Sequence, residues 1–376
     1  MSAVLDYVGI DGAENILDSH CRDTLVGPAS VIDRLRVKPG RSLVAGWSTP
    51  ENRGWLALLT SEDKVEGILR RAARGASDVV LHRHTTSYVL SGSIDTDPRL
   101  ARPLARARKR INDAARVDVV RYNPSRRLVL RVRGNGIPGG DAMMRIAPNG
   151  LDRLLHAEQQ WARSGAPVLN HTWWGHKKTA AITPYWGAGD LVTLRENNAA
   201  YACGRAIALV HRSNELKQPI AATSVLRHEA PREVAVVAVL LPDLRERLDA
   251  VAARLRESVV EAGTVPIHGD LSPDQILTDG SQIRIIDLDR ARLGSPNEDL
   301  GTWCASCRLL RAPELETAFL DGYATVKEIP ELAPWISRAL LAGALEPFRR
   351  WLPDWPREIE QRLSMAEQAL GERTTQ

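Results

Sequence analysis

The pattern of hydrophobic and polar positions divides the chain into a β-rich first half and a helical second half. The segments "RVKPGRSLVAGW" (36–47) and "RYNPSRRLVLRV" (121–132) have the pattern of a strand, a Pro-containing turn and an apolar strand. Beyond about residue 190 the apolar residues recur at helical spacing, and Gly263 is placed to end one of these helices. The pattern predicts an α+β protein with its helices mainly in the second half.

Those two hairpin segments lie about 85 residues apart and continue in the same way. Each precedes a second apolar strand ("GWLALLT", 54–60, and "DAMMRIA", 141–147) and then a helical stretch (61–75 and 149–165). We interpret them as a duplicated hairpin, strand and helix. The alternative is two unrelated hairpins, because Pro-Gly and Asn-Pro are common turn dipeptides. The predicted units are residues 1–110, which end in an Arg-rich helix, residues 111–189 and residues 190–376.

Composition narrows the class of protein only a little. The net charge is +4 and the sequence pI about 9.0, yet there is no long basic block with interleaved aromatic residues, so a nucleic-acid partner is not expected. No apolar run approaches the about 20 residues that span a bilayer, and the first residues do not resemble a signal peptide. We expect a cytoplasmic protein without a membrane partner. Cys304 and Cys307 in "WCASC" are expected to be core thiols.

The stretch "TVPIHGDLSPDQILTDGSQIRIIDLDRA" (264–291) carries the candidate chemistry. Asp270 follows a short strand, and two further strands joined by an Asp-Gly turn form a predicted hairpin. The hairpin brings its outer ends together, so Asp270 and Gln275 should face Asp287. One carboxylate is then free to take a proton, while a carboxylate and an amide oxygen suit Mg²⁺. The alternative is a surface hairpin with solvated acids.

"HGDLSPDQ" followed by "IIDLD" resembles the catalytic and metal loops of the aminoglycoside phosphotransferase and choline kinase family. The resemblance implies a bilobal protein-kinase-like fold, preceded here by residues 1–110 as an additional N-terminal β/α cap, a possible second N-lobe. It also implies roles at the matching positions: a catalytic base at Asp270, a turn shaped by His268, and metal ligands at Gln275, Asp287 and Asp289. Gln275 stands where most members have Asn, a feature shared with maltokinases, which also carry N-terminal caps.

Other acids and a histidine in the second half of the chain have expected roles as well. Asp299 in "EDLGTW" matches an Asp that starts a helix and holds the catalytic loop, so its expected role is structural. His211 is also expected to be structural. Glu298, Asp289 and Asp321 would lie around the acceptor side, where they could attract a cationic acceptor or simply be solvated.

The nucleotide side is less clearly marked, because no Gly-rich GxGxxG loop is present. The hairpin at 121–132 is the candidate cover for the phosphates, with Arg126 and Arg127 as contacts. The lysine expected on the third strand is absent. Arg145 occupies the best position, with Glu158 as its expected ion-pair partner, while an ordinary strand–helix salt bridge stays open and Arg131 is the competitor.

The segment "TPYWGAGDL" is the expected hinge between the lobes. Its backbone would contact adenine, and Tyr185 or Trp186 would either stack on the base or pack against the protein.

Three functions are compatible with these features. The first is an ATP- and Mg²⁺-dependent kinase that phosphorylates a hydroxyl of a small polar molecule, aminoglycoside- or sugar-like. The second keeps the chemistry but phosphorylates Ser or Thr of a precursor peptide in modified-peptide biosynthesis, with the N-terminal unit holding an acidic leader. The third is a non-catalytic nucleotide-binding protein on a kinase scaffold, because the strand lysine is missing and Gln275 replaces Asn. The sequence does not identify the acceptor, the preference for ATP or GTP, or the oligomeric state.

Overall fold

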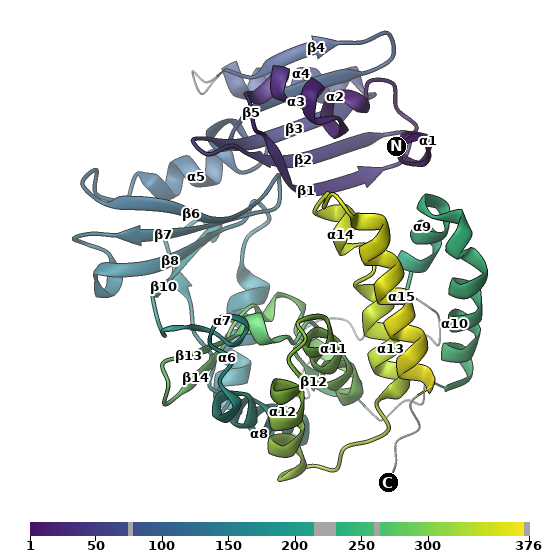
Figure 1. The fold of residues 1–376 in the computed structure, drawn as a ribbon. Helices are drawn as coiled ribbons and strands as arrows, with labels where there is room; N and C mark the ends of the chain where they lie inside the picture. Colours follow the sequence, from purple (N-terminus) through teal and green to yellow (C-terminus); the bar gives the residue numbers. More distant parts are fainter. Residues whose placement is uncertain (74–77, 214–230, 259–263, 372–376) are drawn as a thin grey trace.

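The computed structural model describes residues 1–73, 78–213, 231–258 and 264–371. Two five-stranded antiparallel sheets lie above a helical region (Figure 1). The first sheet has the spatial order β1 (Val31–Lys38), β2 (Ser42–Ser48), β3 (Arg53–Leu59), β5 (Tyr88–Ser93), β4 (Val80–Arg83). The second has the order β6 (Arg116–Asn123), β7 (Arg127–Arg133), β8 (Asp141–Ile146), β10 (Ala180–Pro184), β9 (Thr172–Trp173).

The two sheets therefore share one topology. In each, the order is first, second, third, fifth and fourth strand of the unit, and a helix connects the third strand to the fourth. These helices are α4 (Glu62–Ala73) and α6 (Asp152–Arg163). The repeated sequence pattern thus corresponds to two units with the same strand order. The predicted end of the first helix at residue 75 lies outside the described residues.

Each face of the first sheet packs against a different layer. On one face Leu43, Leu56 and Leu58 belong to the same buried cluster as residues of α1 (Ser2–Val8) and α2 (Glu14–Leu17), and α3 (Ser19–Val26) packs against it. The other face joins a second cluster, which extends through α5 (Ala101–Arg108) to the outer face of the second sheet and includes Trp55, Ile68, Leu104, Leu130 and Met144. This shared core fixes the N-terminal unit (residues 1–110) on the second sheet.

The second half is mainly helical. Its helices are α7 (Leu191–Leu194), α8 (Asn197–Arg212), α9 (Glu233–Leu240), α10 (Arg245–Ser258), α11 (Pro296–Leu309), α12 (Pro313–Ala324), α13 (Ala333–Ala342), α14 (Glu346–Arg349) and α15 (Trp355–Gly371). Short strands frame the candidate loops: β11 (Gly189–Asp190), β12 (Val265–Ile267), β13 (Ile276–Thr278), β14 (Ile283–Ile285) and β15 (Arg292–Gly294). The predicted helix end at Gly263 lies outside the described residues.

The interior of this half is apolar and contains the predicted core thiols. Trp303 stacks on Phe319 with ring centroids 4.3 Å apart, and Cys304 and Cys307 are buried and free on α11. Among the described residues, no helix combines the length and apolar character that crossing a membrane requires.

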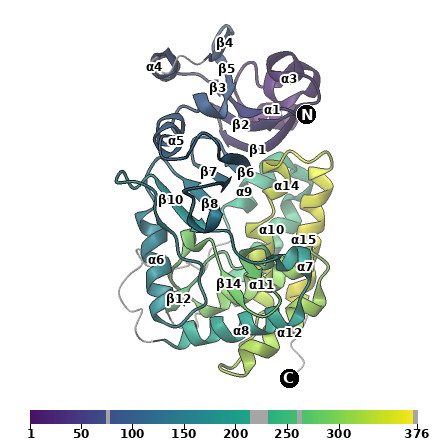
Figure 2. The same ribbon diagram turned by 90° about the vertical axis from the view of Figure 1, so that its left-hand side faces the viewer.

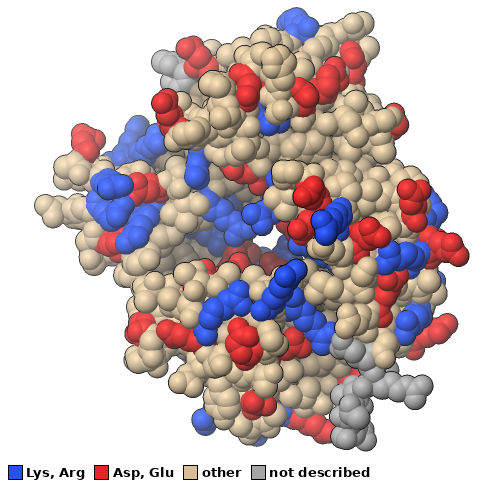
Figure 3. All heavy atoms as spheres, viewed as in Figure 1, with Lys and Arg blue, Asp and Glu red and all other residues tan. Residues whose placement is uncertain are grey.

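The last helices also reach the N-terminal unit. Arg34 of β1 forms an ion pair with Glu346 of α14 at 2.5 Å, and Trp351 Nε1 donates to the carbonyl of Leu17 at 3.1 Å. Figure 2 shows α14 directly below β1. The N-terminal unit therefore touches both the second sheet and the C-terminal helices, and the three parts surround a central hollow (Figure 3).

Candidate active site

The His268–Gly269–Asp270 turn follows strand β12 and needs a glycine at its centre. Gly269 has φ +77°, a backbone conformation that is unfavourable for residues with a side chain. A Cβ atom there would also lie 2.6 Å from the carbonyl oxygen of Arg290, closer than real Cβ contacts. Any larger residue would thus displace either this turn or the segment after Asp287.

Asp299, at the start of α11, anchors the same turn from below. Its carboxylate is fully buried and accepts hydrogen bonds from the backbone N–H groups of His268 at 2.7 Å and Gly269 at 2.8 Å. His211 Nε2 approaches it at 3.3 Å, and the other ring nitrogen of His211 contacts the Tyr323 hydroxyl at 3.0 Å. Burial alone would raise the pKa of Asp299, but these hydrogen bonds and nearby histidines lower it. The predicted structural roles of Asp299 and His211 fit this network.

His268 points away from the cleft. Its side chain is buried edge-on against the ring of Trp161, and Nε2 donates to the carbonyl oxygen of Ile286 at 2.9 Å. This hydrogen bond ties the catalytic turn to the residue before Asp287. This position fits the turn-shaping role that the resemblance implies for His268.

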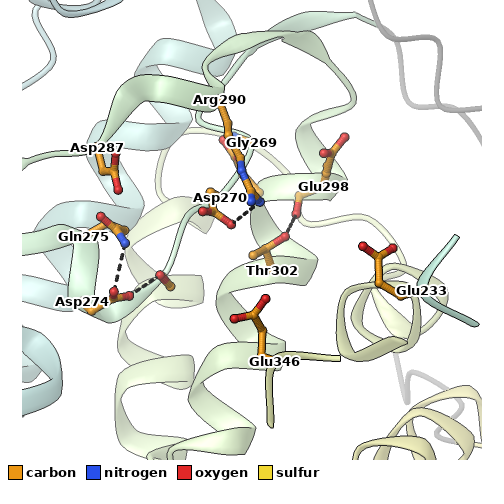
Figure 4. Close-up of polar contacts among 12 residues, drawn as sticks. Glu233, Gly269, Asp270, Asp274, Gln275, Asp287, Arg290, Glu298, Thr302 and Glu346 are labelled. Atoms are coloured by element: carbon orange, nitrogen blue, oxygen red, sulfur yellow. Dashed lines mark hydrogen bonds and ion pairs between the residues drawn. The ribbon is translucent and has the colours of Figure 1, made fainter. Parts of the chain in front are cut away.

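The predicted hairpin brings the metal-loop residues together. Strands β13 and β14 pair in register Ile276↔Ile285, and the backbone N–H of Ile286 donates to the carbonyl of Gln275 at 3.0 Å. Asp287 follows in a left-handed conformation with φ +62°. Figure 4 shows Gln275 between Asp287 and Asp274, with Asp270 beside them. The side chains that the sequence places at the two ends of the hairpin therefore line one site.

Asp270 is partly exposed to the cleft. Its Oδ1 accepts a hydrogen bond from Arg290 Nη1 at 2.9 Å. Burial raises the pKa of Asp270, and the negative charges of Asp287 and Asp274 act in the same direction, whereas Arg290 and His268 oppose the rise. A carboxylate with a raised pKa in a cleft is a candidate proton acceptor.

Two arginines of the second sheet cover the metal-loop acids. Arg127 Nη1 lies 3.1 Å from Asp287 Oδ1 and 3.0 Å from Asp289 Oδ2. Arg145 Nη1 lies 3.0 Å from Asp287 Oδ1, and its second nitrogen contacts Asp289. Burial by itself would raise the pKa of Asp287, but the two guanidinium groups lower it to about 2. Asp287 is therefore ionised at neutral pH.

Residues 125–335 match the model of the phosphotransferase enzyme family, APH. The chain belongs to this family. The spectinomycin phosphotransferase APH(9)-Ia, solved with ADP and spectinomycin, aligns with a TM-score of 0.51 and 11% identity over 67% of this chain and 92% of that one. A choline/ethanolamine kinase family protein from Mesorhizobium loti aligns with a TM-score of 0.49 and 17% identity, over 72% of this chain and 94% of that one. No curated protein matches the chain. The expected kinase-like fold is confirmed.

The prediction of an ion pair between Arg145 and Glu158 is wrong. Glu158 does not hydrogen-bond to Arg145: its carboxylate accepts from the backbone N–H of His171 at 2.9 Å and lies 2.8 Å from His171 Nδ1. Helix α6 turns Glu158 toward the segment before β9, while Arg145 extends into the cleft. The competing candidate, Arg131, pairs with Asp141 at 2.5 Å instead. Arg145 is thus the arginine that reaches the metal-loop acids.

The hinge segment connects β10 to β11 as expected, but its aromatic rings do not line the cleft cavity. The guanidinium of Arg131 lies 3.7 Å from the ring centroid of Tyr185, and that of Arg284 lies 4.9 Å from Trp186. These contacts fit the packing alternative for both rings. The backbone N–H of Ala188 is also used, because it donates to Thr278 at 2.7 Å.

A cavity of about 1250 Å³ lies between the N-terminal unit, the second sheet and the helical half, and a second cavity of about 980 Å³ adjoins it. Both are lined by Asp270, Asp289 and Arg290. Lys and Arg side chains gather around the hollow in Figure 3. The first cavity is large enough for a nucleotide and the second for a small acceptor.

The donor atoms of the site fit a magnesium ion. Asp287 and Asp289 offer carboxylate oxygens, and Gln275 uses its Nε2 on Asp274 at 2.9 Å, which leaves its Oε1 without a hydrogen bond among the described residues. Mg²⁺ prefers a few such oxygens together with substrate phosphates. Arg127 and Arg145 would then exchange their carboxylate partners for phosphate oxygens, which guanidinium groups also bind bidentately.

Proposed function

We propose that this phosphotransferase uses ATP and Mg²⁺ to phosphorylate a hydroxyl of a small polar molecule. The observation that carries the proposal is the convergence of Asp270, Asp287 and two arginines of the second sheet on one cleft. The two family-typical loops thus come from one half of the chain and the cations from the other. Phosphoryl transfer depends mainly on such positioning and charge neutralisation.

Each residue has a defined part in this proposal. Asp270 orients the acceptor hydroxyl and takes its proton. Arg127 and Arg145 bind phosphate oxygens, and Asp287 with Gln275 holds the metal. When bound, the metal neutralises charge on the phosphates. Arg290, paired with Asp270, keeps that carboxylate facing the cleft until the acceptor arrives.

The charges on the acceptor side favour a neutral or anionic acceptor. Glu298 is paired with Arg292, and Asp289 would be occupied by the metal, so neither acid is free to attract a cationic acceptor. The same cavity also presents arginines that form no ion pair within the described part of the chain: Arg121, Arg153 and Arg338. A sugar or sugar acid suits this lining better than a polycationic aminoglycoside.

A precursor peptide is a second candidate acceptor, because an acidic segment would also suit the unpaired arginines. A non-catalytic role is the third, since the arginines on Asp287 and Asp289 occupy the acids that a metal needs. Both are separated from the first proposal by the same experiment.

ATP consumption should be screened against neutral sugars, sugar acids, aminoglycosides and co-encoded peptides, with mass spectrometry of the product. With the accepted compound, Asp270→Asn should reduce turnover by about 10²-fold or more while ATP and Mg²⁺ still raise the melting temperature. Asp321, expected from the sequence near the acceptor side, is exposed on α12 and lines neither cavity, so Asp321→Asn should leave turnover unchanged. Full turnover in Asp270→Asn would refute the proposal. A thermal shift with ATP but no ATP consumption with any acceptor would favour the non-catalytic nucleotide-binding protein.

A further inference from the structure

A third cavity, of about 630 Å³, lies within the N-terminal unit and away from the catalytic loops. Its floor is one face of the first sheet, formed by alternate residues of strands β2 and β3: Val44, Trp55, Ala57 and Leu59. Helix α4 forms one wall with Lys64, Ile68 and Arg71, and the opposite wall comes from Arg99 and the β6–β7 turn. We call it the cap cavity. Its volume suits a small molecule rather than an extended peptide.

The rim of the cap cavity is strongly cationic. Six cationic side chains without an ion pair among the described residues surround it: Arg36, Lys38, Lys64, Arg71, Arg99 and Arg126. Asp63 is the carboxylate among the lining residues, and a further cation, Arg70, is already paired with Glu66. The cavity therefore combines an apolar floor with a positive rim that Asp63, the single carboxylate among its described lining residues, balances only in part.

Arg36 illustrates the repulsion in this arrangement. Its half-buried guanidinium group on β1 forms no hydrogen bond or ion pair with another described residue. Burial lowers the pKa of Arg36, and the neighbouring Arg126 and Arg99 lower it further, while the carboxylate of Asp97 opposes the change. Bringing several guanidinium groups together with few carboxylates is unfavourable, and an anion between them would relieve the repulsion.

The cap cavity lies on the face of the first sheet that corresponds to the cleft-facing side of the second sheet. In the second sheet, Arg127 and Arg145 lie on the face covered by α6, and in the first sheet Val44 and Ala57 lie on the face covered by α4. This agrees with the interpretation of residues 1–110 as a second N-lobe, a degenerate copy of the nucleotide-binding one. The copy keeps the concave face but has no Asp-rich loop opposite it.

The cap cavity is connected to the catalytic cleft through the β6–β7 turn. Arg126 and Ser125 line both cavities, and the next residue, Arg127, contacts Asp287. Buried Asp97 fixes the turn to the N-terminal unit, because it accepts hydrogen bonds from the Tyr122 hydroxyl at 2.6 Å and the Ser125 N–H at 2.7 Å. A ligand in the cap cavity would therefore contact the turn that covers the cleft.

We infer that the cap cavity is a second binding site, for a small phosphate-bearing molecule with an apolar portion, such as a nucleotide. The phosphates lie among Arg36, Arg71 and Arg126, and the apolar part rests on Trp55 and Ala57. The site binds its ligand without transferring a phosphoryl group. Occupancy holds the β6–β7 turn in place and thereby changes the affinity of the cleft for ATP.

The test uses pyrophosphate with the full chain, in the presence of a chelator and 150 mM salt, so that it does not depend on turnover. Hydrogen exchange should show protection by pyrophosphate in α4 and in the β6–β7 turn. The double variant Arg36→Gln/Arg71→Gln should lose this protection and bind at that site at least about tenfold more weakly in calorimetry. The control Lys109→Gln/Arg357→Gln loses the same charge at exposed sites outside the cavity and should bind as the unchanged protein does.

Protection confined to residues 268–290, or equal binding by the double variant, would overturn the proposal. An oligoglutamate peptide that binds more tightly than pyrophosphate would overturn the small-molecule assignment. Because Arg36→Gln relieves repulsion, that single variant should melt no lower than the unchanged protein without anion, and it provides a folded reference should the double variant be unstable. Failure of the ATP-consumption screen leaves these binding measurements unaffected.

Discussion

Asp299→Asn tests whether the catalytic turn is held by one buried carboxylate. In the unchanged protein both oxygens of Asp299 are used, one by the N–H of His268 and the other by the N–H of Gly269. Asparagine keeps a single acceptor oxygen and presents an NH₂ group to the second N–H. One buried donor then loses its partner and faces another donor.

The size of the effect follows from these contacts. A hydrogen bond to a charged acceptor contributes about 1.5–3 kcal/mol, and an unsatisfied buried donor costs about 1–3 kcal/mol more. We therefore expect Asp299→Asn to lower the free energy of unfolding by about 3 kcal/mol. Because the turn also positions Asp270, turnover of the folded variant should fall by about 10²-fold, with a smaller change in the KM for ATP.

Denaturant titration followed by circular dichroism measures the first effect, and ATP consumption at a temperature where the variant is folded measures the second. Asp321→Asn on α12 is the matched control and should change the free energy of unfolding by less than about 0.5 kcal/mol. If Asp299→Asn also falls within that limit, the carboxylate does not hold the turn and our account of the site is wrong.

Three further outcomes follow from the described contacts. Gly269→Ala should abolish turnover, because the added carbon meets the Arg290 carbonyl and the backbone conformation disfavours it; wild-type activity would contradict this. The pKa of Asp287 is lowered to about 2, so its stabilisation, about 2 kcal/mol, is present above pH 5 and is lost as the pH falls toward 2. Asp287→Asn should flatten that acid limb in denaturation measured from pH 2 to 7, and an unchanged slope would rule out the pairing. Tyr122→Phe should cost about 1–2 kcal/mol of stability, because buried Asp97 loses a donor, whereas an unchanged denaturation midpoint would show that the bond contributes nothing.

The catalytic and metal loops could be predicted because their chemistry is local in the sequence. The Asp-Gly turn fixes the register of β13 and β14, and that register alone brings Gln275 next to Asp287. The two-sheet pattern is also local, since each sheet forms from consecutive strands and one inserted helix. In such cases the spacing of residues along the sequence is enough to predict which strands pair and which side chains meet.

The remaining features depend on packing between distant segments. The rotation of α6 about its axis decides whether Glu158 meets Arg145 or His171, and the helical period of its apolar residues does not fix that choice. Arg34 and Glu346 are 312 positions apart, so no local pattern signals their contact. No local pattern indicates the cationic rim of the cap cavity either, because its residues come from four separate segments.

The contact between Arg34 and Glu346 has a consequence for how substrates enter. Kinase-like enzymes commonly exchange ligands by swinging one lobe away from the other. Here the N-terminal unit is attached to both sides of the cleft. It shares a buried core with the second sheet, and it contacts Glu346 and Trp351 of the C-terminal helical region. A large movement of one lobe would have to break these contacts. We therefore expect substrates and products to pass through the hollow between the three parts, without wide separation of the lobes.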